Sequence, residues 1–112
     1  MTAFSTPDPV AVPEIDHRAA AEAYQTGSAR FVDVREPEEW AAGHIPGALH
    51  IPLAELAARA AEIPRGEPII LVCRVGGRSH LATEYLRGLG YDRAVNFDGG
   101  MLAWEEAGHP VE

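Results

Sequence analysis

The chain has 112 residues, 46% of them hydrophobic, which is the size and composition of one globular domain. Its formal net charge is −8 and all 9 basic residues are arginines, so the overall charge disfavours nucleic acid and acidic membranes as partners. No apolar run approaches the roughly 20 residues of a membrane span, and the N-terminus lacks the basic start and apolar stretch of a signal peptide. We therefore predict a cytoplasmic protein.

Residues 1–12 are rich in Pro, Thr, Ser and Ala and are predicted to form a flexible tail before a single domain, residues 13–112. Asp16 is a suitable N-cap for a helix that runs to about Gln25, and Gly27 is a suitable stop. The following segments alternate between strand-like and helix-periodic patterns. Strands are predicted over 30–34, 47–51, 69–72 and 94–97. Helices are predicted over 37–43, 53–61, 79–89 and 101–106.

This alternation of strands and helices predicts an α/β domain with a mainly parallel sheet. The run Ile69–Val72 is short, apolar and β-branched, which is typical of a strand buried on both faces of such a sheet. The carboxyl ends of parallel strands share one edge, and ligands bind in the crevice outside it. The only cysteine, Cys73, is the residue that follows this run.

Cys73 begins a loop that contains two glycines and two arginines, and Ser79 opens the helix after it. Backbone N–H groups of such a loop, together with the helix dipole and the arginine charges, form an anion cradle. A cradle of this kind lowers the pKa of a thiol below about 8.5. We interpret Cys73 as a nucleophile, because a small buried structural cysteine would need none of these features. The predicted binding residues are Arg74, Val75, Gly76, Gly77, Arg78 and Ser79.

Cysteine-based phosphatases and arsenate reductases share this kind of cradle, but they place five residues between the cysteine and the arginine. Here four residues separate Cys73 from Arg78, and the shorter loop suits a small sulfur better than a tetrahedral phosphate. His44 and His80 are the nearest candidate bases, and both are interpreted as structural or surface residues. No histidine pair has ligand spacing, so neither a metal site nor a cofactor is predicted. Trp40 and Trp104 are predicted to pack in the core.

Three segments of the chain resemble the signatures of rhodanese-like domains, in the expected order. The resemblance covers roughly residues 13–112. It lies in Asp33–Trp40 with Gly43–Ala48, in Cys73–Ser79, and in Gly99–Met101 with Trp104 and Gly108–Val111.

The resemblance implies a rhodanese-like fold, with a mainly parallel five-stranded sheet flanked by helices on both faces. It implies a thiosulfate:cyanide-type sulfurtransferase that moves a sulfane sulfur from a donor such as thiosulfate to a thiophilic acceptor, which is cyanide, a thiol or a partner protein. Cys73 would carry the sulfur as a persulfide, and the loop would bind that persulfide or the departing sulfite. Asp33 and Arg35 would shape the rim of the pocket. Covalent catalysis of this kind implies ping-pong kinetics.

Two alternatives remain beside this interpretation. One is a persulfide carrier that passes sulfur to a protein, and the other is a non-catalytic regulatory or binding module. Such modules usually lack the cysteine, which this chain retains. Val75 departs from the small polar residue common at its loop position, and the chain has one domain where the best-known enzymes have two. The expected assembly is a monomer or a weak homodimer.

Overall fold

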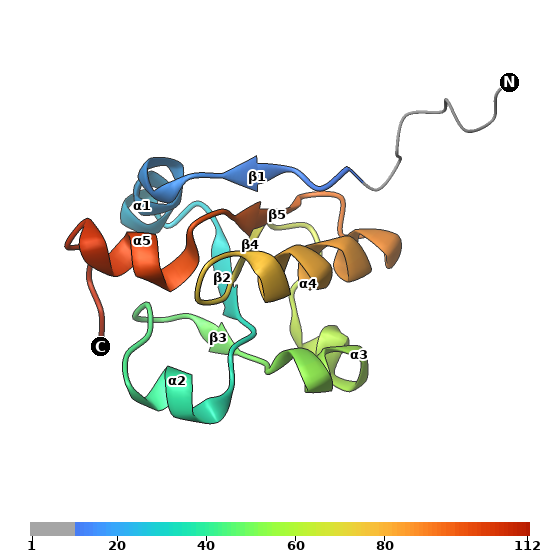
Figure 1. Ribbon diagram of the computed structural model, residues 1–112. Helices are drawn as coiled ribbons and strands as arrows, with labels where there is room; N and C mark the ends of the chain where they lie inside the picture. The colour runs from blue at the N-terminus through green and yellow to red at the C-terminus, as the bar shows by residue number, and fades with distance from the viewer. Residues whose placement is uncertain (1–10) are drawn as a thin grey trace, which may run out of the picture.

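The computed structural model describes residues 11–112, and residues 1–10 of the predicted tail lie outside the described residues. One 5-stranded sheet crosses the described domain in the order β1-β5-β4-β2-β3, and every neighbouring pair is parallel (Figure 1). The strands are β1 Glu14–Ile15, β2 Arg30–Asp33, β3 Leu49–His50, β4 Ile69–Val72 and β5 Ala94–Phe97. The predicted α/β domain with a five-stranded parallel sheet is confirmed.

Helices cover both faces of this sheet, as predicted (Figure 1). They are α1 His17–Thr26, α2 Pro37–Ala41, α3 Leu56–Arg59, α4 Gly77–Gly88 and α5 Gly100–Glu106. Successive side chains of a strand point to opposite faces. Accordingly, Ile70 and Val72 of β4 pack with α1 and α5, whereas Ile69 and Leu71 pack with α3 and α4. This double burial explains why the sequence of β4 is apolar without interruption.

The segment predicted as one helix over 53–61 is a succession of shorter turns. A 3₁₀ turn, Leu53–Glu55, precedes α3, and a second one, Ala60–Glu62, follows it. The buried Tyr91 hydroxyl lies 2.7 Å from the Ile63 carbonyl and 3.0 Å from the Ala60 carbonyl. These carbonyls lie in the last turn of the predicted helix and beyond it, where a helix offers no internal partner, and the apolar spacing alone could not predict this long-range contact.

Other differences concern the ends of elements. The strand predicted over 47–51 is reduced to β3, and β1 was not predicted because two residues carry no strand pattern. Helix α4 begins two residues before the predicted Ser79, because Gly76 has a φ of 112° and turns the chain directly into the helix. The predicted cap of α1 is confirmed, since the Asp16 carboxylate accepts from the N–H of Ala19 at 3.0 Å. No helix within residues 11–112 is long and apolar enough to cross a membrane.

Candidate active site

Cys73 lies at the carboxyl end of β4, which has β5 on one side and β2 on the other in the middle of the sheet. The residue is 1% exposed and carries a free thiol. Its Sγ accepts a hydrogen bond from the Gly76 N–H at 3.1 Å and lies 3.2 Å from the Ser79 hydroxyl oxygen. The loop and the first turn of α4 therefore direct hydrogen-bond donors at the sulfur.

The carbonyl groups of the loop are held away from the sulfur by the chain around the start of α5. Three successive carbonyls each accept a backbone N–H from this segment. The pairs are Cys73 with Met101 at 2.9 Å, Arg74 with Leu102 at 3.0 Å, and Val75 with Gly99 at 3.3 Å. Gly100 fits closely beneath them, because a Cβ at this position would lie 2.7 Å from the Arg74 carbonyl oxygen. With its carbonyls held outward, the loop can present its N–H groups inward.

Two opposing effects act on the pKa of the Cys73 thiol. Burial raises the pKa, whereas the Ser79 side chain and the backbone N–H groups of Ser79, Gly76 and Val75 stabilise the thiolate. The hydrogen bonds outweigh the burial, and the pKa of Cys73 lies below that of an ordinary cysteine thiol. The site thus favours the nucleophilic form of the cysteine.

Asn96 of β5 completes this arrangement beneath the loop, and it was not among the site residues predicted from the sequence. Asn96 Oδ1 lies 2.6 Å from the Ser79 hydroxyl. Asn96 Nδ2 donates to the Gly76 carbonyl at 3.1 Å and to Glu14 Oε2 at 2.9 Å. Asn96 is 1% exposed and Ser79 is 0% exposed. The sequence did carry one sign that Asn96 has a special role, namely a polar amide within an otherwise apolar strand, where Asn is uncommon. His80, one of the candidate bases, lies at the surface beside Glu14 at 3.5 Å.

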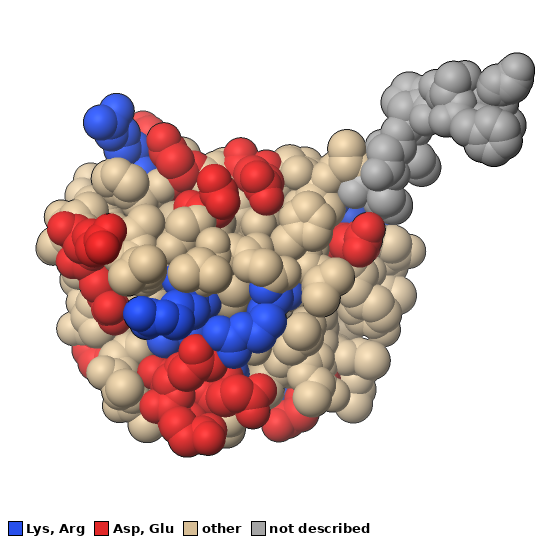
Figure 2. Space-filling model, viewed as in Figure 1, with Lys and Arg blue, Asp and Glu red and all other residues tan. Residues whose placement is uncertain are grey.

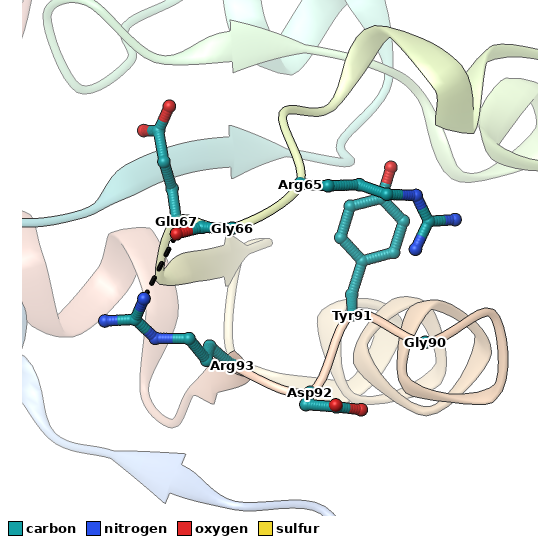
Figure 3. Close-up of a pocket in the computed structure, with 7 residues that line it drawn as sticks. All are labelled: Arg65, Gly66, Glu67, Gly90, Tyr91, Asp92 and Arg93. Carbon is teal, nitrogen blue, oxygen red and sulfur yellow. Dashed lines mark hydrogen bonds between the residues drawn. The ribbon is translucent and has the colours of Figure 1, made fainter.

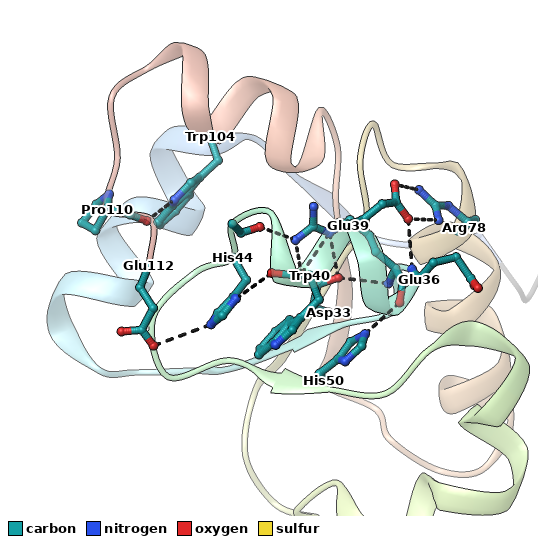
Figure 4. A network of polar contacts seen from close by, with 12 residues as sticks. Asp33, Glu36, Glu39, Trp40, His44, His50, Arg78, Trp104, Pro110 and Glu112 are labelled. Atoms are coloured by element: carbon teal, nitrogen blue, oxygen red, sulfur yellow. Dashed lines mark hydrogen bonds and ion pairs between the residues drawn. The ribbon is translucent and has the colours of Figure 1, made fainter.

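Arg78 makes a two-pronged ion pair with Glu39 of α2, with N–O distances of 2.7 and 2.9 Å (Figure 4). The hydrogen bond from Arg78 holds the pKa of the Glu39 carboxyl at about 2, below its ordinary value of 4.5. The negative charge of Glu39 therefore largely offsets the positive charge expected from Arg78. Arg74, in contrast, is exposed to solvent. Figure 2 shows the same pattern at larger scale, with a band of arginines directly against a group of acidic side chains.

Asp33 and Arg35 form a buried ion pair near the loop. The two residues are 1% and 4% exposed, and Arg35 Nη2 lies 2.8 Å from both the Asp33 carboxylate and the Gly43 carbonyl. Arg35 also lines a hollow of about 260 Å³ together with Arg74 and Glu39. Arg35 therefore reaches the side of the loop, while Asp33 holds the guanidinium of Arg35 in place.

The two tryptophans differ in their surroundings. Trp104 is 0% exposed, as predicted, and its Nε1 donates to the Pro110 carbonyl at 2.7 Å (Figure 4). The prediction that Trp40 packs in the core is wrong, because α2 lies at the periphery and Trp40 is only half-buried. Its ring stacks between the imidazoles of His44 and His50, at centroid distances of 3.6 and 4.6 Å. His44 is therefore engaged in stacking, as expected of a structural histidine.

A second hollow, of about 230 Å³, lies at the opposite end of the strands (Figure 3). The residues that line it belong to the two segments immediately before β4 and β5, 65–67 and 90–93, whereas Cys73 follows β4. Its cationic side chains already have partners. Arg65 stacks over the Tyr91 ring at 4.3 Å, and Arg93 donates to the Gly66 carbonyl at 3.1 Å. This hollow is separate from the cysteine loop and lacks a nucleophile.

The fold and the loop together define an α/β domain that presents one cysteine in a cradle of N–H donors. Residues 16–107 match the model of the Rhodanese-like domain. The chain belongs to the rhodanese-like family, and the predicted resemblance is confirmed.

Named relatives support this membership. The chain is 39% identical over 101 residues to a sulfurtransferase of Allochromatium vinosum, covering 89% of this chain and 94% of that protein. It is 32% identical to the crystal structure of a rhodanese-related protein from Thermoplasma volcanium, with a TM-score of 0.83 over 89% of this chain and 97% of the other. It is 36% identical to the putative sulfur carrier protein YrkF of Bacillus subtilis, covering 83% of this chain but 51% of that protein.

Proposed function

We propose that the protein is a sulfurtransferase in which Cys73 attacks a sulfane-sulfur donor and carries the sulfur as a persulfide. The observation that carries the proposal is the placement of Sγ, which lies 3.1 Å from the Gly76 nitrogen and 3.2 Å from the Ser79 hydroxyl. These donors stabilise a thiolate, which is the reactive form of a cysteine. The names of the sulfurtransferase and the sulfur carrier among the relatives support sulfur as the transferred atom.

With thiosulfate as donor, the Cys73 thiolate attacks the terminal sulfur and forms a new S–S bond. The bond between that sulfur and the sulfonate breaks, and its electron pair leaves with sulfite. One negative charge on the protein therefore moves from Sγ to the outer sulfur. Cyanide then attacks the outer sulfur, thiocyanate leaves, and the thiolate returns. The N–H groups of the loop would stabilise the negative charge on sulfur in both states, and exposed Arg74 would attract the dianionic donor.

A persulfide carrier that delivers sulfur to a protein is the second candidate. Val75 of the loop and Leu81 of α4 are both 55% exposed, although both are large apolar side chains. The exposed apolar side chain of Val75, in the loop that holds the nucleophile, is suited to contact with a protein acceptor. The relative named a putative sulfur carrier supports the same possibility.

The test is mass spectrometry of the intact protein before and after incubation with thiosulfate. We expect one added sulfur atom on Cys73, and its removal as thiocyanate when cyanide is added. Cys73→Ser should abolish both steps, because a hydroxyl is far less nucleophilic than a thiolate. A persulfide that forms but is not removed by cyanide or small thiols would favour the carrier. Failure to form a persulfide with thiosulfate and with a small persulfide donor would favour a non-catalytic module.

A further inference from the structure

The side-chain amide of Asn96 has its orientation set by its neighbours. Its Nδ2 faces two oxygen acceptors, the Glu14 carboxylate at 2.9 Å and the Gly76 carbonyl at 3.1 Å. Only the NH₂ end of an amide can donate to such oxygens. Oδ1 must therefore point toward Ser79, and it can only accept a hydrogen bond there.

The Ser79 hydroxyl has one proton and two acceptors within reach. Its oxygen lies 2.6 Å from Asn96 Oδ1 and 3.2 Å from Cys73 Sγ. If the proton points to Sγ, two oxygen atoms face each other at 2.6 Å without a proton between them. Ser79 is 0% exposed and Asn96 is 1% exposed, so bulk water cannot relieve this conflict. The proton can satisfy only one of the two acceptors at a time.

We propose that Asn96 is a positioning residue that competes with Cys73 Sγ for the proton of the Ser79 hydroxyl. With a thiolate, the proton turns toward Sγ and Oδ1 loses its donor. With a thiol, or with a persulfide whose charge lies on the outer sulfur, Sγ is a weak acceptor and the proton turns to Oδ1. The hydroxyl rotates without breaking a bond. Asn96 therefore disfavours the thiolate relative to the persulfide, and its role in sulfur loading rests on the proposed function.

Several charged groups near the site act electrostatically on the sulfur. Within the described part of the chain, these groups are Arg74, the ion pairs Arg78–Glu39 and Arg35–Asp33, Glu14 and His80. Only Glu14 contacts the Asn96 amide directly. Glu14→Gln is therefore the control that separates an effect of Glu14 from an effect of Cys73.

The first test measures the rate of Cys73 alkylation against pH in a double-mutant cycle. Ser79→Ala should raise the inflection pH, since it removes a donor to Sγ. Asn96→Leu, which keeps the approximate shape of Asn, should lower the inflection by on the order of half a pH unit, since it leaves the Ser79 proton to the sulfur. In the Ser79→Ala background, Asn96→Leu should cause no such decrease. An unchanged or raised inflection in Asn96→Leu with Ser79 intact would refute the competition.

The second test follows the Asn96 amide of the wild-type protein directly and uses variants only as controls. The carbon-13 shift of the Asn96 side-chain carbonyl in the wild-type protein should change with the alkylation inflection, since Oδ1 loses its donor there. It should return toward its low-pH value when thiosulfate converts Cys73 to a persulfide. The pH response should persist in Glu14→Gln and be absent in Cys73→Ala.

An Asn96 carbonyl shift that stays constant while Cys73 ionises would refute the competition, even in a protein that transfers sulfur. If the pH response occurs as expected but no sulfur is transferred, the proton competition stands and the proposed sulfurtransferase function fails.

Discussion

The loop around Cys73 is held from two sides, and the two sets of contacts differ in burial. On the inner side, the carbonyls of the loop bond to the start of α5, and Ser79 and Asn96 are 0% and 1% exposed. On the outer side, α2 holds the loop through the Arg78–Glu39 ion pair, whose side chains are 35% and 30% exposed. Leaving a buried polar group without its partner costs about 1–3 kcal/mol, whereas an exposed ion pair contributes about 0.2–1 kcal/mol.

This difference in burial implies that the inner contacts affect the chemistry of the sulfur more strongly than the ion pair with α2 does. Inner contacts act on Sγ directly, through the Gly76 N–H and the Ser79 hydroxyl. The outer contact makes no hydrogen bond to Sγ; it acts through the position of α4 and through the charge of Arg78, which Glu39 largely offsets. Substitutions on the inner side should therefore have larger effects on sulfur chemistry and stability than substitutions on the outer side.

The largest effect is expected for Gly100→Ala. Gly100 has a φ of 52°, and an added Cβ would lie 2.7 Å from the Arg74 carbonyl oxygen, so the loop must move. We expect loss of sulfur transfer by about 100-fold or more, since a displacement of about 1 Å can cost that much. Gly88→Ala in α4 is the matched control, because a Cβ there meets nothing within 4 Å. Equal activity in both variants would show that the start of α5 does not hold the loop.

The two tryptophans give the next comparison. Trp104→Ala should lower the free energy of unfolding by about 3–5 kcal/mol, because the ring is fully buried. Trp40→Ala should cost less than about 2 kcal/mol, because it loses only two stacking contacts at a half-buried position. Urea denaturation of both variants measures the difference. A larger loss for Trp40→Ala would mean that α2 is as important to stability as the buried side.

The two arginines test the outer contact itself. Arg78→Ala should reduce kcat/KM by about 10-fold, a smaller loss than Gly100→Ala causes, because Arg78 makes no hydrogen bond to Sγ and Glu39 already offsets most of its charge. Arg74→Ala should have a smaller effect, since Arg74 is exposed. Arg78→Lys should restore activity only in part, because lysine lacks the planar fork that meets both oxygens of Glu39. A full rescue by lysine would show that charge alone is sufficient.

The smallest effect is a loss of stability in acid. The Glu39 carboxyl has a pKa of about 2 in the folded protein against an ordinary value of 4.5, so folding favours its ionised form. This contribution is fully present above pH 4.5 and disappears as the pH falls toward 2. We expect less than about 1 kcal/mol, because solvent screens the pair. In urea denaturation across this range, Glu39→Gln should lack this component, and an unchanged pH dependence would contradict the prediction.

The amino-acid sequence was sufficient to predict the features that depend on local patterns. Alternating segments predict the parallel α/β sheet, and the apolar run of β4 places Cys73 at its carboxyl edge. The two glycines after Cys73 predict a loop able to present N–H groups, since backbone geometry at glycine is a local property. The resemblance to rhodanese-like domains was visible for the same reason, because its motifs are short and continuous.

The side chains that surround the loop became known from the three-dimensional fold. Ser79 and Asn96 are 17 positions apart, and Arg78 and Glu39 are 39 positions apart. No periodicity along the chain relates such residues, because their contacts depend on how β5 and α2 lie against α4. The sequence therefore suggested two positive charges at the sulfur, whereas the fold pairs one of them with Glu39. The sequence also suggested a core position for Trp40. The apolar pattern of a short helix is the same whether the helix packs on the sheet or at its periphery, so it could not reveal that Trp40 is half-buried.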